Sequence, residues 1–317
     1  MSSSVLARPA LTPGTPGSPD APTRPRRPSR RWREVAQLGF TLPALLWFLV
    51  FTVGPLVSLF YFSMTSWRGL IAPRTFVGPQ NFTKLVTDPV FHQAIVNTVI
   101  QLVVTLPIVV LGAFMLAYYV SLRPRGHRFI RAMLFTPVLL SAPALAMVFT
   151  GVFAPSGLVN GVLDSVGLED VTKPWLANDH TAFVAIMVVI VWSSLSVTAV
   201  MLASRMNTIP SEVFEAAEID GAGHGRRMWQ IAFPMCKEFV GVVTMLQFLW
   251  TLFSSAAIVL LLTRGGPGTS TVNLSFLVYD YAFNQSKVGY SQAIAVALFI
   301  VGVAGLLGIR RAFREKD

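Results

Sequence analysis

The sequence predicts an all-α integral membrane protein with six transmembrane helices, from its composition, its charge-free windows and the placement of its basic residues. Of its 317 residues, 53% are hydrophobic and only 13% are charged, and the mean hydropathy is +0.61. Such a chain has too little polar surface for an ordinary soluble domain. We therefore expect most of it to lie in a lipid bilayer.

Windows without Asp, Glu, Lys or Arg predict the spans. There are six of them: Val35–Ser66, Pro89–Leu122, Ala132–Leu163, His180–Ser204, Phe239–Thr263 and Val288–Ile309. Each can cross a membrane, since a crossing takes roughly 20 apolar residues and a central charge costs about 2.5 to 3.5 kcal/mol. The expected spans are 38–64, 92–121, 130–153, 181–204, 238–263 and 288–309. The third has the least defined limits, because it contains several prolines.

Basic residues set the predicted orientation. The N-terminal segment, the 2–3 and 4–5 connections and the C-terminal segment hold 19 of the 25 Lys and Arg, and only nine of the 15 acids. By the positive-inside rule, both termini and the 4–5 connection are cytoplasmic. These segments account for the net charge of +10, which is spread over four sites beside the membrane. We therefore expect contacts with membrane lipid and no nucleic-acid binding.

The ends of the chain differ in composition from the rest. Residues 1–33 are rich in Pro, Ser, Thr and Arg, which predicts a disordered basic cytoplasmic tail. The membrane domain then covers residues 34–317. The first span is too long for the apolar core of a signal peptide, so we expect it to be retained as a helix.

We expect no catalytic residues and no metal site. The four histidines lie on different connections without metal-ligand spacing, and Cys236 is the single cysteine. The chain has no G-x-x-x-x-G-K-[ST] phosphate loop, so it should bind no nucleotide cofactor and should not hydrolyse ATP by itself.

A polar island separates the fourth and fifth windows. It comprises Glu215, Ala216, Ala217, Asp220, Gly221 and Ala222, and Pro234 follows it. Ser211 suits a helix start and Glu212 places negative charge near the positive helix end. Gly221 is placed to end this helix, because glycine tolerates the left-handed conformation. The small alanines would let a groove on another protein approach closely; a connector resting on lipid headgroups is the alternative.

A polar stripe marks the fifth span. Gln247, Trp250, Thr251 and Ser254 fall at i, i+3, i+4 and i+7, which predicts one helical face near the middle of the membrane. Hydroxyl-rich solutes need hydrogen-bonding groups and a flat apolar surface, and this stripe offers both. Ser194 on the fourth span is a further candidate. Helix packing is the alternative role.

The second span carries a different polar set. Asn97, Thr98 and Gln101 form a partial polar face. We expect these side chains to bond neighbouring helices rather than a solute.

The polar island resembles the EAA loop of ATP-binding-cassette (ABC) importer permeases. The similarity rests on E-A-A at 215–217, D-G-A at 220–222, and Ile231 with Pro234 at the family's spacing. Met228 departs from the pattern, where an aromatic residue is commoner. The resemblance implies that Glu215 to Gly221 form a coupling helix docked in a cleft of a cytosolic ATPase.

Flanking segments narrow the resemblance. Leu262-Thr-Arg-Gly-Gly-Pro267, Gly289-Tyr290, Phe76-Val-Gly78 and Asn97-Thr98 are similar to carbohydrate-importer permeases of the maltose and glycerol-phosphate type. This implies a bacterial cell-membrane protein that carries a sugar, oligosaccharide or polyol. The implied partners are a second permease subunit in a heterodimer, two cytosolic ATPase subunits that use ATP and Mg, and an extracytoplasmic solute-binding protein.

Two other classes of protein stay open at this point. A secondary transporter would usually carry ionisable residues inside its spans, and the six windows contain none. A membrane scaffold or receptor subunit would bind the ATPase and transport nothing.

Overall fold

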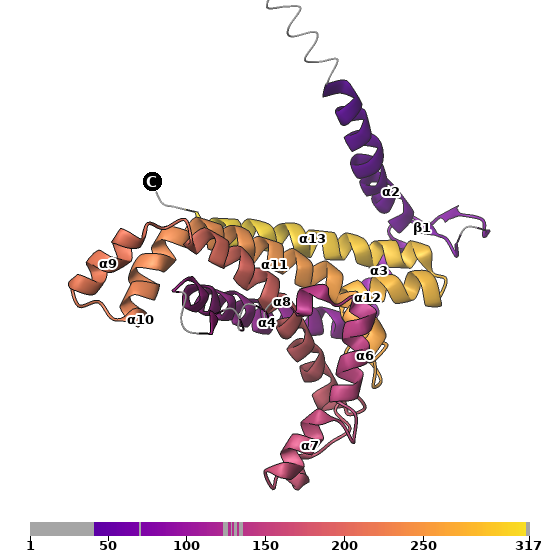
Figure 1. Ribbon diagram of the computed structural model, residues 1–317. Coiled ribbons are helices and arrows are strands. Elements are labelled where there is room, and N and C mark those ends of the chain that lie inside the picture. Colours follow the sequence, from indigo (N-terminus) through magenta and orange to yellow (C-terminus); the bar gives the residue numbers. More distant parts are fainter. Residues whose placement is uncertain are drawn as a thin grey trace, which may run out of the picture. The chain divides into compact units, whose positions relative to one another are not determined.

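The computed structural model describes residues 41–69, 71–122, 126–127, 129, 132 and 136–314, and these are mostly helical (Figure 1). The predicted tail of residues 1–33 and most of the basic 2–3 connection lie outside the described residues. The chain divides into two units, the first ending at Pro55 and the second beginning at Leu56.

The first apolar helix runs from Thr41 to Ser63. It contains a π-helical turn, η1 (Leu49–Val53), followed by α2 (Gly54–Ser63). Trp47 and Phe51 stack with ring centroids 4.2 Å apart. Its most apolar stretch has a mean hydropathy of 2.1, which suits contact with lipid chains.

Four further helices of the described chain are long and apolar enough to cross a membrane. They are Pro89–Ser121 (α4), Asp179–Met206 (α8), His224–Leu262 and Val288–Phe313 (α13). The third of these contains α10 (His224–Arg226), the π-helical turn η4 (Arg227–Ala232) and α11 (Phe233–Leu262). With Thr41–Ser63, they make five candidate spans in the described part of the chain.

The predicted third span corresponds to shorter pieces. These are the 3₁₀ turn η2 (Pro137–Leu139), which begins at Pro137, and α6 (Ala142–Val152), whose second residue is Pro143. Proline is compatible with the first turn of a helix but removes a backbone donor farther in. The prolines therefore explain why helices begin at these points. Residues 130–131 and 133–135 lie outside the described part.

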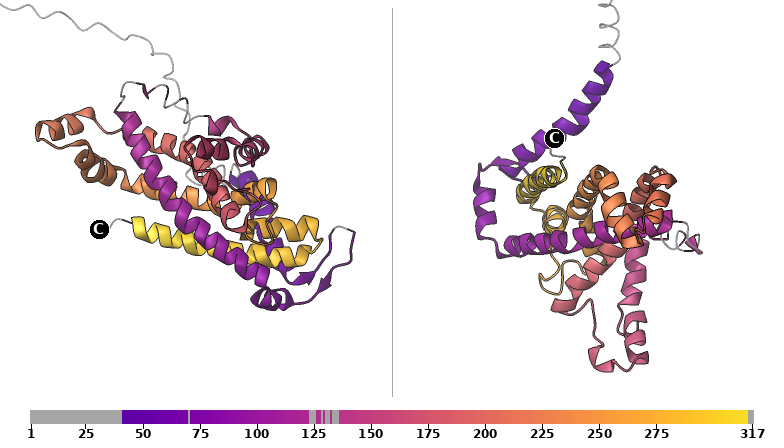
Figure 2. Two further views of the ribbon diagram at one scale, coloured as in Figure 1. Left: turned by 90° about the horizontal axis from the view of Figure 1, so that it is seen from below. Right: turned by 90° about the vertical axis from the view of Figure 1, so that its left-hand side faces the viewer.

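The long helices of the second unit pack together. α11 contacts α4, α8 and α13, and α4 contacts α8 (Figure 2). Alanines at 113, 117, 199 and 203 are buried in one cluster with Leu202 and Val240. Small residues let membrane helices approach closely and gain van der Waals contact. This close packing fixes α8 and α11 side by side, where the candidate site lies.

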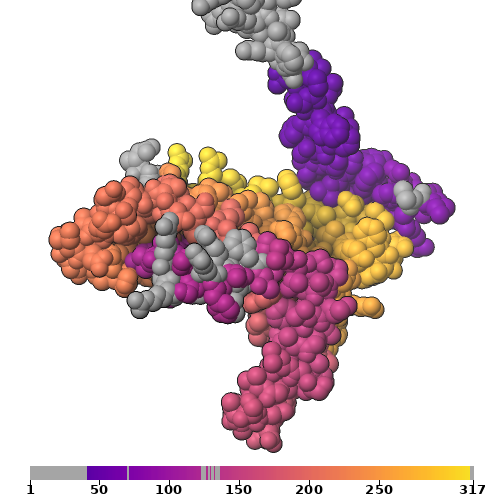
Figure 3. Space-filling model, viewed as in Figure 1, coloured from indigo at the N-terminus to yellow at the C-terminus, as the bar shows by residue number. Residues whose placement is uncertain are grey.

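Short elements connect these helices. They are β1 (Thr65–Ser66) paired antiparallel with β2 (Thr75–Phe76), α3 (Gln80–Thr87), α7 (Leu158–Ser165), η3 (Glu169–Val171), α12 (Leu274–Tyr279) and η5 (Asp280–Asn284). The loop that carries α7 and η3 projects from the long helices (Figure 3). α9 (Ser211–Ile219) follows α8.

Asp88 ties the start of α4 to η5 and to the first turn of α13. One carboxylate oxygen accepts from the backbone N–H groups of Val90 and Phe91, and the other accepts from the hydroxyls of Tyr281 (3.1 Å) and Tyr290 (2.6 Å). Burial raises the pKa of Asp88, but these hydrogen bonds outweigh it and lower the pKa below its usual value. Burial first, and then the charge of Asp88, raise the pKa of Tyr281 to about 12.

Candidate functional site

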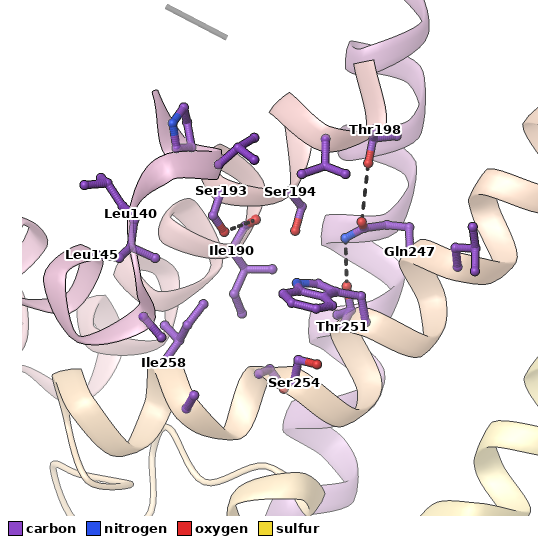
Figure 4. A pocket seen from close by; sticks show the side chains of 18 of the residues that line it. Leu140, Leu145, Ile190, Ser193, Ser194, Thr198, Gln247, Thr251, Ser254 and Ile258 are labelled. Carbon is purple, nitrogen blue, oxygen red and sulfur yellow. Dashed lines mark hydrogen bonds between the residues drawn. The ribbon is translucent and has the colours of Figure 1, made fainter. Parts of the chain in front are cut away.

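A cavity of about 590 Å³ lies between α6, α8 and α11 (Figure 4). Its walls include apolar side chains of all three helices, among them Leu145, Ile190, Val197, Val243 and Ile258. Its polar groups come from α8 and α11, namely Ser193, Ser194, Thr198, Gln247, Trp250, Thr251, Ser254 and Ser255. No charged residue lines it in the described part of the chain.

The predicted stripe of α11 lies along this cavity. Gln247, Trp250, Thr251 and Ser254 all line it, because residues at this spacing share a helix face. The Gln247 amide donates to Thr251 Oγ1 (3.1 Å), and its carbonyl accepts from Thr198 Oγ1 (3.4 Å). Trp250 is 59% exposed, so its ring offers a flat apolar surface with few protein contacts.

Ser194 supplies an unsatisfied hydroxyl to the cavity. The residue is 4% exposed, and its Oγ has no hydrogen-bond partner in the described residues. Figure 4 shows this hydroxyl pointing toward the space between α8 and α11. A buried polar atom without a partner costs about 1 to 3 kcal/mol. Because this oxygen is itself enclosed, a bound molecule with a hydroxyl group would remove that penalty only after a neighbouring side chain moves.

The combination of surfaces defines what the cavity can hold. A flat ring, several amide and hydroxyl groups, and apolar walls without charge suit an uncharged molecule that carries hydroxyls on an apolar ring face. The sequence did not indicate Thr198, Ser255 or the α6 wall. Thr198 and Ser255 each lie four residues after a candidate, Ser194 and Thr251, and this spacing was the available signal.

The polar face of the second span bonds neighbouring helices through Thr98 and Gln101, as predicted, whereas Asn97 bonds the loop after α11. Asn97 Nδ2 donates to the carbonyls of Ser270 (2.9 Å) and Val272 (2.8 Å). Thr98 Oγ1 accepts from the N–H of Leu274 (3.0 Å), and Gln101 Nε2 donates to the carbonyl of Thr251 (3.3 Å). These three residues are at most 5% exposed, so α4 binds the loop after α11 through buried polar groups.

The polar island forms a helix and a tight turn. α9 ends at Ile219, and Gly221 has a φ of +76°, the left-handed conformation predicted for it. The N–H of Ala222 donates to the carbonyl of Ala217 (2.8 Å) and that of Gly221 to Glu218 (3.0 Å), which closes the helix end. Glu215, Ala216 and Asp220 are exposed, whereas Ala217 is buried.

One ion pair braces this turn against the following helix. Arg227 Nη1 lies 2.8 Å from Glu218 Oε2, and Arg227 is only 7% exposed. Phe214 of α9 meets Tyr118 of α4 at a centroid distance of 6.4 Å. Pro234 is the second residue of α11 and is exposed. Phe214, Ala217 and Glu218 therefore anchor α9, whereas Glu215, Ala216 and Asp220 face outward.

The described residues form no candidate metal site. No set of three or more His, Cys, Asp or Glu side chains comes together there in a way that could hold a metal ion. Cys236, also described, is a buried free thiol.

Comparison with known proteins places the chain in a family. The family described as "Binding-protein-dependent transport system inner membrane component" matches residues 90–314. The probable ABC transporter permease protein YurN of Bacillus subtilis is 35% identical over 84% of this chain and 91% of that protein. The sulfoquinovosyl glycerol transport system permease SmoG of Agrobacterium fabrum is 31% identical over 85% of this chain and 86% of its own length.

Two further relatives extend the comparison. The multiple sugar-binding transport system permease MsmF of Streptococcus mutans is 32% identical over 83% of this chain and 90% of its own length. A bacterial ABC transporter involved in the import of the acidic polysaccharide alginate has the same fold, with a TM-score of 0.75 at 19% identity over 90% of this chain and 99% of that chain. These matches confirm the resemblance predicted from the polar island and its flanking segments. The chain therefore belongs to the binding-protein-dependent inner membrane components, the permease subunits of ABC transporters, and is a multi-pass protein of the bacterial plasma membrane.

Proposed function

We propose that the chain is a permease subunit of an ATP-driven importer of a carbohydrate or related polyol, and that the cavity between α6, α8 and α11 forms its half of the translocation path. The observation that carries this proposal is the cavity wall, in which the free Ser194 hydroxyl and the exposed Trp250 ring stand beside Gln247, Thr251 and Ser254. A sugar can donate and accept with its hydroxyls while one ring face lies on the indole. No step of chemistry on the solute is involved.

The names of the relatives support the carbohydrate class. SmoG is named for sulfoquinovosyl glycerol, MsmF for multiple sugars, and the diacetylchitobiose permease NgcF of Streptomyces coelicolor, 31% identical, for a disaccharide. These are different solutes, so the shared feature is the carbohydrate class and not one sugar. The uncharged lining of the cavity agrees with that class.

The polar island would couple this subunit to ATP hydrolysis. In the proposal, the exposed Glu215, Ala216, Asp220 and Gly221 dock on one of two cytosolic ATPase subunits, which bind ATP and Mg, while Ala222 and Pro234 fix the turn and the start of α11. The braces at Phe214 and Glu218 support such a role, because a docking helix must pass force to the membrane helices rather than swing freely.

The remaining partners follow from the same proposal. A second, non-identical permease subunit would complete the path, and an extracytoplasmic binding protein would deliver the solute. One of the solved neighbours is an alginate ABC transporter in complex with a pentasaccharide-bound periplasmic protein. Six spans with both termini in the cytoplasm fit this arrangement, with η2 and α6 as the described part of the third span.

Reconstitution tests the proposal. The chain would be co-expressed with a second permease subunit, an ATPase and a solute-binding protein from the same genome, and ATP hydrolysis in proteoliposomes would be measured with a panel of neutral di- and oligosaccharides. We expect at least one saccharide, delivered by the binding protein, to stimulate hydrolysis and to accumulate inside. Binding of the ATPase without uptake of any saccharide in the panel would favour a scaffold, and uptake driven by an ion gradient without ATP would favour a secondary transporter.

A variant in the turn tests the coupling role. Gly221→Asp adds a side chain at a position with positive φ and open space around it. We expect normal insertion with strongly reduced uptake and stimulated hydrolysis. Gly223→Asp is the matched control, since it adds the same charge two residues away without a positive φ. Wild-type uptake by Gly221→Asp would remove the turn from the coupling path.

A further inference from the structure

The loop between α11 and α13 turns back into the protein. Every residue from Thr271 to Leu277 is buried, although this segment connects two long helices. Asn97 of α4 holds it by donating to the carbonyls of Ser270 and Val272, and Thr98 holds it by accepting from the Leu274 N–H. We call Thr271 to Leu277 the returning segment.

Asn273 is the centre of this arrangement. Its side-chain N–H groups donate to Gln101 Oε1 and to Ser255 Oγ, both at 3.0 Å. Its carbonyl oxygen accepts from the Phe276 N–H (2.9 Å) and from Ser275 Oγ (3.0 Å), so it also caps α12. The residue is 1% exposed, and both of its donors and its acceptor are used.

Two hydrogen bonds, one from Asn273 and one from Gln101, lead directly to residues of the cavity wall. Ser255, which receives a bond from Asn273, lines the cavity, and so does Thr251, whose carbonyl accepts from Gln101 Nε2 (3.3 Å). Thr251 in turn accepts from Gln247. The returning segment and the α11 wall of the cavity are therefore joined by one chain of buried hydrogen bonds.

We infer that Gln101 and Asn273 are positioning residues for the solute site: they hold Thr251 and Ser255 against the returning segment, so that movement of this segment changes the shape of the cavity. Neither residue lines the cavity. A buried amide whose partners are all satisfied keeps its neighbours in one arrangement, because any displacement leaves polar groups unpaired. That the cavity binds a solute rests on the proposed function, whereas the hydrogen-bonded link between the returning segment and the cavity does not.

A chemical probe tests the link without transport. Ser254→Cys places a thiol in the cavity, and Cys236→Ala removes the single native cysteine, which is 1% exposed. In the complex assembled with its partner subunits, the rate of labelling by a water-soluble maleimide would report the geometry of the cavity. We expect Gln101→Met, and separately Asn273→Ser, to change this rate by about threefold or more. Asn273→Ser keeps an oxygen that can cap α12 but cannot reach Gln101.

Thr105→Val is the matched control. Thr105 is also buried on α4, one turn from Gln101, but its hydroxyl donates only to the carbonyl of Gln101 within its own helix. We expect it to leave the labelling rate unchanged. The double variant Gln101→Met with Asn273→Ser should change the rate no more than the larger single change, because both remove the same connection.

The outcomes separate positioning from plain stability. A lowered thermal stability of Gln101→Met with an unchanged labelling rate would overturn the inference, since packing alone would then explain the residue. Should Asn273→Ser fail to assemble, Gln101→Met decides the question by itself. Failure of uptake with every sugar would count against the proposed function and would leave the labelling result readable.

Discussion

The returning segment and the cavity wall are both lined by buried polar side chains, yet they differ in how those side chains are satisfied. Around the returning segment, Asn97, Gln101 and Asn273 all have protein partners within 3.3 Å, although the Ser270 hydroxyl, one residue before the segment and away from the cavity, has none among the described residues. Around the cavity, the Ser194 hydroxyl has none among the described residues, and Trp250 is 59% exposed. The two regions meet at Thr251 and Ser255.

This difference separates framework from site. A satisfied polar network in an apolar surrounding costs little and specifies one arrangement, whereas an unsatisfied group carries a penalty that a ligand can relieve. Polarity alone therefore does not mark a binding site in a membrane helix. A polar group beside a cavity marks a binding site when it has no hydrogen-bond partner in the protein.

The largest expected effect is on the framework side. Asn97→Leu would leave the buried carbonyl of Val272 and the partly buried carbonyl of Ser270 without their donor. We expect a loss of about 1 to 3 kcal/mol of stability, measured as a lower unfolding temperature in detergent. Gln93→Ala is the control, because Gln93 is exposed and bonds only to the Asn97 side chain. Equal stability of Asn97→Leu and wild type would contradict the contrast between the two regions.

Next in size is an effect on the cavity side. Trp250→Ala should reduce solute affinity by about tenfold, since it removes the flat surface for a sugar ring, while stability changes little because the side chain is mostly exposed. Uptake in proteoliposomes as a function of sugar concentration measures the solute affinity, and thermal unfolding measures the stability. Phe253→Ala serves as control, because Phe253 is an aromatic residue of the same helix, 45% exposed, that does not line the cavity. Unaltered uptake kinetics in Trp250→Ala would take the ring out of the solute path.

The Tyr281–Asp88 contact extends the framework outside the spans and gives a pH dependence. The pKa of Tyr281 is raised to about 12, from an ordinary value of 10.0. Its contribution to stability is therefore fully present below pH 10 and is lost as the pH rises toward 12. We expect the unfolding temperature to fall more steeply from pH 10 to 12 in wild type than in Tyr281→Phe. Parallel curves for the two proteins would show that the phenol proton is not held by this contact.

The contribution of Asp88 to stability depends on pH in the opposite direction to that of Tyr281. Because its pKa is lowered, its contribution is present above its ordinary value of 3.8 and is lost only as the pH falls through the lowered value. Neither group therefore changes stability between about pH 5 and 9. The contribution of this contact to stability is therefore constant over the pH range in which a transporter works, as a framework contact requires.

Local spacing explains which features the sequence could reveal. Gln247, Trp250, Thr251 and Ser254 share a face because an α-helix repeats every 3.6 residues, and Gly221 ends a helix because it alone there adopts a positive φ without strain. Asn273 could not be recognised in this way. Its partner Gln101 lies 172 residues away, and only the packing of α4 against α11 brings them together.

The third span shows another limit of sequence patterns. Its window contains no charged residue, which indicates a membrane location. Hydropathy does not show, however, that Pro137 and Pro143 divide this span into η2 and α6. The α6 wall of the cavity follows from that division. The side chains of α6 that line the cavity together with Ile190 and Ile258 were therefore not predicted as part of the site.

The smallest effect expected is the most diagnostic. Ser194→Ala removes a hydroxyl that has no partner among the described residues, so stability should be unchanged or slightly higher. Thr98→Val removes a bonded hydroxyl and should lower stability. Solute affinity should fall by about two- to tenfold in Ser194→Ala, the size of one net hydrogen bond. Thermal unfolding and uptake measured on the same preparations give both quantities. A loss of stability in Ser194→Ala equal to that in Thr98→Val would mean that Ser194 belongs to the framework, and the distinction between the two regions would then fail at the residue on which it depends most.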